Sequence, residues 1–369
     1  MNNPAPILEA QGLHVVRAGA HLLDVPSLTL HEGQTLSLIG PNGAGKTTFM
    51  QTLAYLLRQF QGEIAFRGRK VGPDLSVFEY RRKLAMVFQE PLLFDTTVFN
   101  NVASGLRIRG IGKEEMHRQV TKNLDRFGIA LLSERSARNL SGGEAQRTSL
   151  ARAFAIKPEI LFLDEPFASL DPPSRESLVE DLQRVLRETG TTTILATHDR
   201  LEALRLSDRM AVMSAGKILQ LGPPDEVMNR PVDEFVASFV GVETILNGWV
   251  IKRNGGSFLA NVSEHEVEAV GDVHVGEEVA LCIRPENVTL SIHPFKETTS
   301  ARNMFPGKII AVSPMGLFQK VLLDCGFPLV AYVTNHSLEN LMLREGKEVN
   351  ASFKATAIHV VRKRKERKE

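Results

Sequence analysis

The sequence predicts an α/β domain of the phosphate-loop (RecA-like) type with a helical subdomain, followed by an all-β region of two small OB-like barrels. Three observations support this fold class. A glycine-rich loop stands between a short apolar strand and a helix. Apolar, strand-like runs then alternate with helices up to about residue 240, and beyond it short alternating segments are separated by Gly, Asn and Pro turns. A chain of 369 residues is long enough for two or three domains.

The strand-like runs of the first part are short and apolar, as expected for strands of a largely buried sheet. They lie near residues 7–16, 27–30, 35–39, 62–66, 84–88, 160–163, 192–196 and 209–213. Between Pro91 and Arg152 the strands stop and helical patterning takes over, including KEEMHRQVTKNLDRFG at 113–128. We therefore expect a first domain over 1–240, with its helical subdomain at about 91–152.

The loop GPNGAGKTT fits the pattern G-x-x-x-x-G-K-[ST], with an apolar strand before it and a helix after it, over about 48–57. Successive backbone N–H groups in such a loop curl around a phosphate, and the positive end of the following helix faces the same anion. We expect Lys46 to reach the β- and γ-phosphates and Thr47 to offer its hydroxyl to Mg²⁺. The residues expected to bind the nucleotide here are Gly40, Pro41, Asn42, Gly43, Ala44, Gly45, Lys46, Thr47 and Thr48.

Five further motifs follow the loop. ILFLDEP, at 160–166, is an apolar strand that ends in Asp164 and Glu165, which suits magnesium binding by the first carboxylate and polarisation of a water by the second. The others are Gln89 after the strand-like LAMVF, the segment LSGGEAQR at 140–147 with SLD after it at 169–171, and His198 after another apolar strand. Each alone has an ordinary structural explanation. Their order and spacing together are not coincidental.

This set resembles the ATPase subunit of ABC transporters over roughly residues 5–240. The resemblance implies that Glu165 is the general base, that His198 is the switch histidine at the γ-phosphate, and that Thr47, Gln89 and Asp164 surround Mg²⁺. It also implies that ATP lies between the phosphate loop of one subunit and the signature of the other, so that the active species is a homodimer. The residues expected at that second half-site are Ser141, Gly142, Gly143 and Asp171. ATP and Mg²⁺ are the implied cofactors.

One departure from the family concerns adenine. The family usually stacks an aromatic residue on the base about two dozen positions before the phosphate loop, and no Tyr, Phe or Trp occurs between Met1 and Gly40. Arg17, or Val16, stands at that position. A guanidinium can stack on a base, so Arg17 is a candidate for adenine binding. A solvated loop arginine is an equally good interpretation.

Composition narrows the possible partners and the location. The formal net charge is +1, so the chain as a whole has no strong positive potential that would attract nucleic acid. Two distant cysteines, Cys282 and Cys325, predict no disulfide framework and a reducing compartment. No signal peptide opens the sequence, and no apolar stretch approaches the ~20 residues needed to span a bilayer. With the resemblance, this implies a peripheral subunit at the cytoplasmic face of the inner membrane, bound to separate permease subunits and, indirectly, to an extracytoplasmic substrate-binding protein.

The all-β region contains an internal repeat. VGEEVALCIRPENVTL at 275–290 aligns with EGKEVNASFKATAIHV at 345–360 at a constant offset. We expect a first lobe over 243–295, a second over 298–362 and a basic tail over 363–369. The tail is expected to be a solvated end.

The second lobe resembles the molybdate-binding Mop/TOBE-type module. The resemblance implies an oxyanion site, shared across a dimer, made of Ser300, Arg302, Thr334, Ser337 and Lys354. Two cations with hydroxyl donors suit a tetrahedral dianion. The alternative is that the lobe only dimerises or caps the barrel.

Three functional hypotheses remain open. The first is the ATP-hydrolysing subunit of a molybdate or tungstate importer, with the sequence unable to choose between the two anions. The second is the same kind of ATPase serving sulfate, a sugar or a polyamine. The third is an oxyanion-sensing or storage protein whose ATPase drives a task other than transport.

Overall fold

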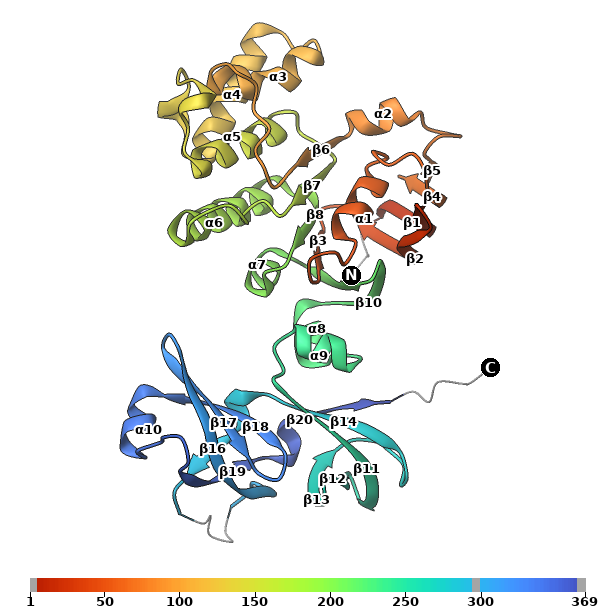
Figure 1. Cartoon of the computed structure of the whole chain (residues 1–369). Helices are drawn as coiled ribbons and strands as arrows, with labels where there is room; N and C mark the ends of the chain where they lie inside the picture. The colour runs from red at the N-terminus through yellow and green to blue at the C-terminus, as the bar shows by residue number, and fades with distance from the viewer. Residues whose placement is uncertain (1–4, 294–298, 364–369) are drawn as a thin grey trace. The chain divides into compact units, whose positions relative to one another are not determined.

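The computed structural model describes residues 5–293 and 299–363 and divides the chain into two compact units, Met1–Pro224 and Asp225–Glu369 (Figure 1). The first unit contains the expected α/β domain. The sequence alone set that domain's end at residue 240, whereas the two short helices α8 (Pro224–Asn229) and α9 (Glu234–Phe239) fall at the start of the second unit.

The centre of the first unit is a six-stranded sheet in the order β10-β9-β3-β8-β7-β6. All neighbours are parallel except the edge pair β9 and β10. The strands β3, β7 and β8 are buried along their whole length, which explains their continuous apolar sequence. The bounds are Thr35–Ile39 (β3), Leu84–Val87 (β6), Ile160–Asp164 (β7), Thr192–Thr197 (β8), Arg209–Ser214 (β9) and Lys217–Gly222 (β10).

A second sheet, antiparallel and four-stranded, has the order β2-β1-β4-β5. Its members are β1 (Pro6–Arg17), β2 (Ala20–His31), β4 (Gln61–Phe66) and β5 (Arg69–Lys70). The strand β2 begins seven residues before the run expected at 27–30, because its first half pairs with β1 down to the hairpin at Arg17 and Ala20. In this first half, buried residues alternate with more exposed ones, so the sequence shows no continuous apolar run.

Helices lie on both flanks of the central sheet. The helix α1 (Lys46–Leu53) follows the phosphate loop, and α3 (Val98–Ile108), α4 (Lys113–Arg126) and α5 (Gly142–Ala155) form the helical subdomain on the side away from β1 and β2 (Figure 1). The expected helix at 113–128 is α4. The remaining helices of this unit are α2 (Val77–Arg82), α6 (Pro172–Thr189) and α7 (Arg200–Leu206). No helix among the described residues is long and apolar enough to cross a membrane.

The second unit holds two five-stranded antiparallel sheets that share one apolar core. The sheets are β13-β12-β11-β14-β20 and β15-β19-β16-β17-β18. The first has β11 (Thr244–Asn254), β12 (Ser257–Val262), β13 (His265–Val270), β14 (Glu278–Ile283) and β20 (Ile358–Arg362). The second has β15 (Thr289–Ser291), β16 (Asn303–Met315), β17 (Phe318–Asp324), β18 (Pro328–Thr334) and β19 (Glu348–Phe353), with the short helix α10 (Asn335–Asn340) after β18.

The two segments of the repeat exchange their last strands. The strand β15 follows the first repeat in sequence but pairs with β19, and β20 follows the second repeat but pairs with β14. The expected repeat offset holds in the structure: β14 and β19 correspond, and so do the two single turns of 3₁₀ helix at Pro285–Asn287 and Ala355–Ala357. Each lobe is therefore completed by a strand from the other.

Candidate nucleotide site

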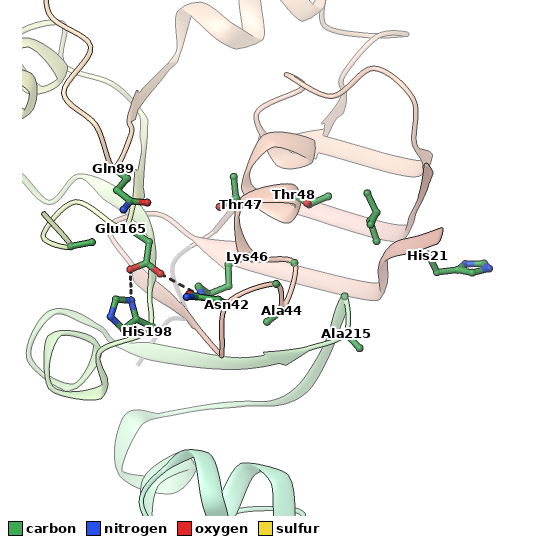
Figure 2. Close-up of a pocket in the computed structure, with 15 residues that line it drawn as sticks. His21, Asn42, Ala44, Lys46, Thr47, Thr48, Gln89, Glu165, His198 and Ala215 are labelled. Carbon is green, nitrogen blue, oxygen red and sulfur yellow. Dashed lines mark hydrogen bonds and ion pairs between the residues drawn. The ribbon is translucent and has the colours of Figure 1, made fainter. Parts of the chain in front are cut away.

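A cavity of about 550 Å³ surrounds the phosphate loop of the first unit. Figure 2 shows Lys46, Thr47, Gln89, Glu165 and His198 gathered about it from different elements. They come together because β3, β7 and β8 are parallel neighbours, so the residues after their carboxyl ends meet at one edge of the sheet. The expected loop residues Asn42, Gly43, Ala44, Gly45, Lys46, Thr47 and Thr48 all line this cavity.

The phosphate loop is closed tightly on itself. The ammonium of the buried Lys46 donates to the carbonyl oxygen of Gly40 at 2.8 Å and to that of Pro41 at 3.2 Å. Gly45 precedes α1 at a φ of 99°, and a Cβ there would lie 3.1 Å from both the Cα of Gly216 and the carbonyl oxygen of Leu22. Only glycine fits this left-handed and crowded position. The loop thus brings the Lys46 ammonium close to the first N–H groups of α1.

Oxygen ligands for a hard cation lie beside the loop. The Thr47 hydroxyl donates to a carboxylate oxygen of Asp164 at 3.0 Å, and Gln89 lines the same cavity. Burial raises the pKa of Asp164, against the opposing effect of the Thr47 hydrogen bond. Hydroxyl, carboxylate and amide oxygens are the donors that Mg²⁺ prefers. No group of three His, Cys, Asp or Glu suited to a metal occurs in the described part of the chain, so a metal here would need phosphate and water oxygens as well.

Glu165 lies between two side chains that can carry a positive charge, Lys46 and His198. One carboxylate oxygen lies 3.5 Å from the Lys46 ammonium, and the other lies 2.6 Å from Nδ1 of His198 (Figure 2). The backbone of Glu165 has a φ of 48°, a left-handed conformation that is uncommon for a residue with a side chain. This turn, directly after β7, aims the carboxylate at the mouth of the phosphate loop. The carboxylate is therefore placed to polarise a water.

Five lining residues were not found from the sequence: His21, Leu22, Ala168, Ala215 and Gly216. The turn between β9 and β10 is fixed against the loop, since the Gly216 N–H donates to the carbonyl of Ala44 at 2.9 Å and Asp24 N–H donates to Gly216 O at 2.8 Å. The only sequence signal was the Ala-Gly pair between two strand-like runs. Arg17 does not line the cavity and is exposed at the end of β1, whereas His21, near the start of β2, is one of the lining residues.

The signature residues lie outside this cavity. Ser141 is the N-cap of α5, where it forms a reciprocal capping box with Glu144: the Glu144 N–H donates to the Ser141 hydroxyl at 3.3 Å, and the Ser141 N–H donates to the Glu144 carboxylate at 2.7 Å. Ser141 and Gly142 are exposed and Gly143 is partly exposed. Asp171 caps α6 by accepting from the Ser174 N–H at 3.3 Å. Within a single chain, the signature and the phosphate-loop cavity are therefore separate.

The five residues expected to bind an oxyanion fall into two groups at opposite ends of β16. Arg302 and Lys354 flank the first pair of the β16–β19 ladder, Asn303 with Phe353, and Ser300 precedes them. Thr334 lies at the far end of β16, since it pairs with Phe318, which in turn pairs with Met315. Thr334 caps α10 and accepts from the Ser337 N–H at 3.1 Å. One chain alone does not bring the five residues together.

The strand–loop–helix, the two carboxylates after β7 and the parallel sheet define the first unit as a phosphate-loop nucleotide-binding domain. Comparison with known proteins refines this class. The ABC transporter family matches residues 23–168 and the TOBE domain family matches residues 299–360.

Several curated relatives match nearly the whole chain. The molybdate/tungstate import ATP-binding protein of Pyrococcus horikoshii is 37% identical over 336 residues, 90% of this chain and 94% of that protein. The spermidine/putrescine import ATP-binding protein of Borreliella afzelii is 33% identical and covers 94% of each chain. The trehalose/maltose import ATP-binding protein of Thermococcus litoralis is 33% identical over 90% of this chain and 91% of its own length.

Among solved structures, CbiO1 from Clostridium perfringens, described as part of an ABC transporter complex, is 29% identical with a TM-score of 0.57, covering 65% of this chain and 96% of that one. The chain belongs to the family of ABC import ATP-binding proteins. It is an ATP-binding ATPase with a C-terminal TOBE domain.

Proposed function

We propose that this chain is the ATP-hydrolysing subunit of a molybdate or tungstate importer. In this proposal it works as a homodimer with Mg²⁺, bound to separate permease subunits at the cytoplasmic face of the membrane and served indirectly by an extracytoplasmic substrate-binding protein. The observation that carries the choice of substrate is the whole-length similarity to a molybdate/tungstate import protein, with the TOBE match over the segment that resembles an oxyanion-binding module.

The geometry supports a role in ATP hydrolysis for the residues that follow the carboxyl ends of β3, β7 and β8. Lys46 and the N–H groups at the start of α1 would bind the β- and γ-phosphates in place of the carbonyls and the carboxylate that Lys46 now contacts. Thr47, Asp164 and Gln89 would hold Mg²⁺, which supplies charge neutralisation at the phosphates. Glu165 would accept a proton from the attacking water, and His198 would orient the Glu165 carboxylate or donate to the γ-phosphate.

The exposed signature supports the dimer. Ser141 and the first N–H groups of α5 form an exposed helix start outside the cavity described above, and a helix start of this kind can bind an anion. A second copy would bring this helix start over the phosphate loop of the first, and each copy would then complete the other's site. The same logic applies to the oxyanion residues, because Arg302 and Lys354 of one copy could meet Thr334 and Ser337 of another at a shared interface.

Uptake measurements test the substrate. In cells that lack this chain, labelled molybdate or tungstate uptake should be lost, restored by the parent and not restored by Lys46→Ala. Excess unlabelled tungstate should compete with molybdate, and excess sulfate, spermidine or maltose should not. Restoration of spermidine or maltose uptake instead, as the similarity to polyamine and sugar importers allows, would assign the chain to that solute. ATPase activity without any uptake defect would favour a non-transport role.

A further inference from the structure

A second polar cavity lies within the Asp225–Glu369 unit and has no part in the sites described above. Its volume is about 290 Å³, near the lower end of the ~300–1,000 Å³ found for small-molecule sites. Three segments far apart in sequence supply its polar lining: Arg230 after α8, Arg284 with Asn287 after β14, and Thr356 with His359 around the start of β20. Two arginines therefore line one small space.

The walls of this cavity are fixed by their own hydrogen bonds. Arg284 donates to the carbonyl oxygen of Met228, and Nε2 of His359 lies 2.8 Å from the carbonyl oxygen of Pro231, to which it can donate. Met228 lies in the last turn of α8 and Pro231 in the connection from α8 to α9, so these bonds fasten the end of α8 and that connection to the barrel. The Arg284 side chain is 22% exposed, which leaves part of its fork accessible. The groups that would contact a ligand are thus held in place before it arrives.

The cavity has two neutral side chains without a hydrogen-bond partner in the described part of the chain, and they lie beside its two arginines. The side chains of Asn287 and Thr356 make no hydrogen bond to any other residue that the structure describes. The carboxylate nearest the guanidinium of Arg284 is that of Glu286, at 3.7 Å, too far for a bidentate pair. Burial lowers the pKa of His359, and the neighbouring charges of Arg230 and Arg284 lower it further. The cationic side chains that line the cavity are therefore those of the two arginines.

We propose that this cavity binds a small tetrahedral oxyanion between Arg284 and Arg230, with Asn287 and Thr356 as neutral donors. Guanidinium forks suit the paired oxygens of a tetrahedral dianion, and a site with hydroxyl and amide donors satisfies its remaining oxygens. All of these residues belong to one chain, so binding needs no second copy. A bound anion would join the end of α8 to both halves of the internal repeat.

This site is separate from the one expected at Ser300, Arg302, Thr334, Ser337 and Lys354, and it does not depend on the proposed transport substrate. Molybdate, tungstate, sulfate and inorganic phosphate share the required shape and charge. The class of ligand follows from the cavity, and the identity of the anion is left to the binding measurement.

Two measurements on the full chain test the proposal. Crystals soaked in tungstate should show an anomalous peak between Arg230 and Arg284. Calorimetric titrations with molybdate, tungstate, sulfate and phosphate should identify at least one anion that binds the parent. Asn287→Asp and Arg230→Gln should each weaken that binding at least tenfold, because the first adds a repelling charge and the second removes an attracting one. Asn254→Asp and Arg253→Gln, matched changes on the exposed hairpin of β11, should leave it unchanged.

The Arg302→Ala/Lys354→Ala double variant separates this site from the one expected in the TOBE segment. Tungstate bound between the two arginines in that double variant supports the cavity, whatever happens to the other site. Loss of all anion binding in the double variant, with normal binding in Asn287→Asp and Arg230→Gln, would overturn the cavity and keep the other site. Absence of both the peak and any titration signal in the folded parent overturns it as well. A peak unaccompanied by variant-sensitive binding in solution would mean an adventitious ion only.

Discussion

Glu165 follows the buried strand β7 at a φ of 48°, with its carboxylate shared between Lys46 and His198. A left-handed residue at this point costs about 1–3 kcal/mol unless the surroundings support it. Here the support is visible, because the Glu165 N–H donates to the carbonyl of Ala196 on the neighbouring strand at 2.9 Å. The sequence predicted the residue and its chemistry from its place after an apolar strand. It could not predict the strained backbone, which depends on the packing of β8.

Glu165→Gln is expected to lower ATP turnover by ~10²–10⁴, the usual contribution of a general base, while ATP still binds. The amide keeps the size of the side chain but cannot accept a proton. Steady-state hydrolysis and equilibrium ATP binding measure the two effects. Glu176→Gln, which changes an exposed carboxylate on α6, is the control and should hydrolyse ATP normally. Near-normal turnover by Glu165→Gln would refute the assignment.

Two residues of the β1–β2 hairpin, Arg17 and His21, are candidates for stacking on adenine. Arg17→Ala should weaken ATP binding by about 0.5–2 kcal/mol if the guanidinium stacks on the base, and Arg17→Tyr should restore it. His21 lines the cavity and Arg17 does not, so His21→Ala is the informative comparison. ATP affinities from calorimetry decide between them. Weaker binding in His21→Ala alone would contradict the role of Arg17.

Some helices and strands could be predicted from local sequence patterns, and others could not. The strands β3, β7 and β8 and the helix α4 follow from apolar runs and helical periodicity, which are local properties. The first half of β2 and the exchange of β15 and β20 do not, because they are set by pairing between segments far apart in sequence. The same reason explains why Ala215 and Gly216 were missed: their place beside the phosphate loop comes from the β9–β10 turn.

Asn303 shows how one side chain joins the two sheets of the second unit. It is 1% exposed, and its amide accepts from the Glu268 N–H and donates to the Glu268 carbonyl, each at 2.8 Å. Asn303→Ala would leave both backbone groups unsatisfied. We expect a loss of unfolding free energy of about 1–3 kcal/mol for each group that stays buried. Urea denaturation measures it, with the exposed Ser300→Ala as the control; equal stability of the two variants would contradict this role.

The two thiols report on the second unit alone, because both cysteines of the chain lie in it. Cys282 and Cys325 are unpaired and buried, and burial raises the pKa of Cys282 to about 12 and that of Cys325 to about 11. Since the thiolate is the reactive form, alkylation near pH 8 should be slow in the folded chain and fast in denaturant. Mass spectrometry of iodoacetamide-treated protein measures both rates. Rapid labelling of the native chain would show that this unit opens readily.

At the scale of the whole molecule, an α/β unit of the ATP-binding family precedes a β unit for which we propose anion binding. The order of the motifs made the first unit predictable, because each motif carries a chemical requirement at a fixed place in the fold. The second unit was predictable as a repeat, but the places of its polar residues in the fold were not. One chain separates Arg302 and Lys354 from Thr334 and Ser337, and the cavity at Arg284 is lined by segments that are far apart in sequence.

The central claim is that ATP is held between the phosphate loop of one copy and the signature of another. The most direct test is the amount of ATP that Glu165→Gln retains through rapid gel filtration. We expect one ATP per chain, retained in a dimer of about twice the 40.8 kDa chain mass, and its loss when Ser141→Arg is added. Ser76→Arg removes a comparable capping box, that of α2, and should leave retention intact. No retained ATP in Glu165→Gln, or retention that Ser141→Arg does not change, would contradict the claim.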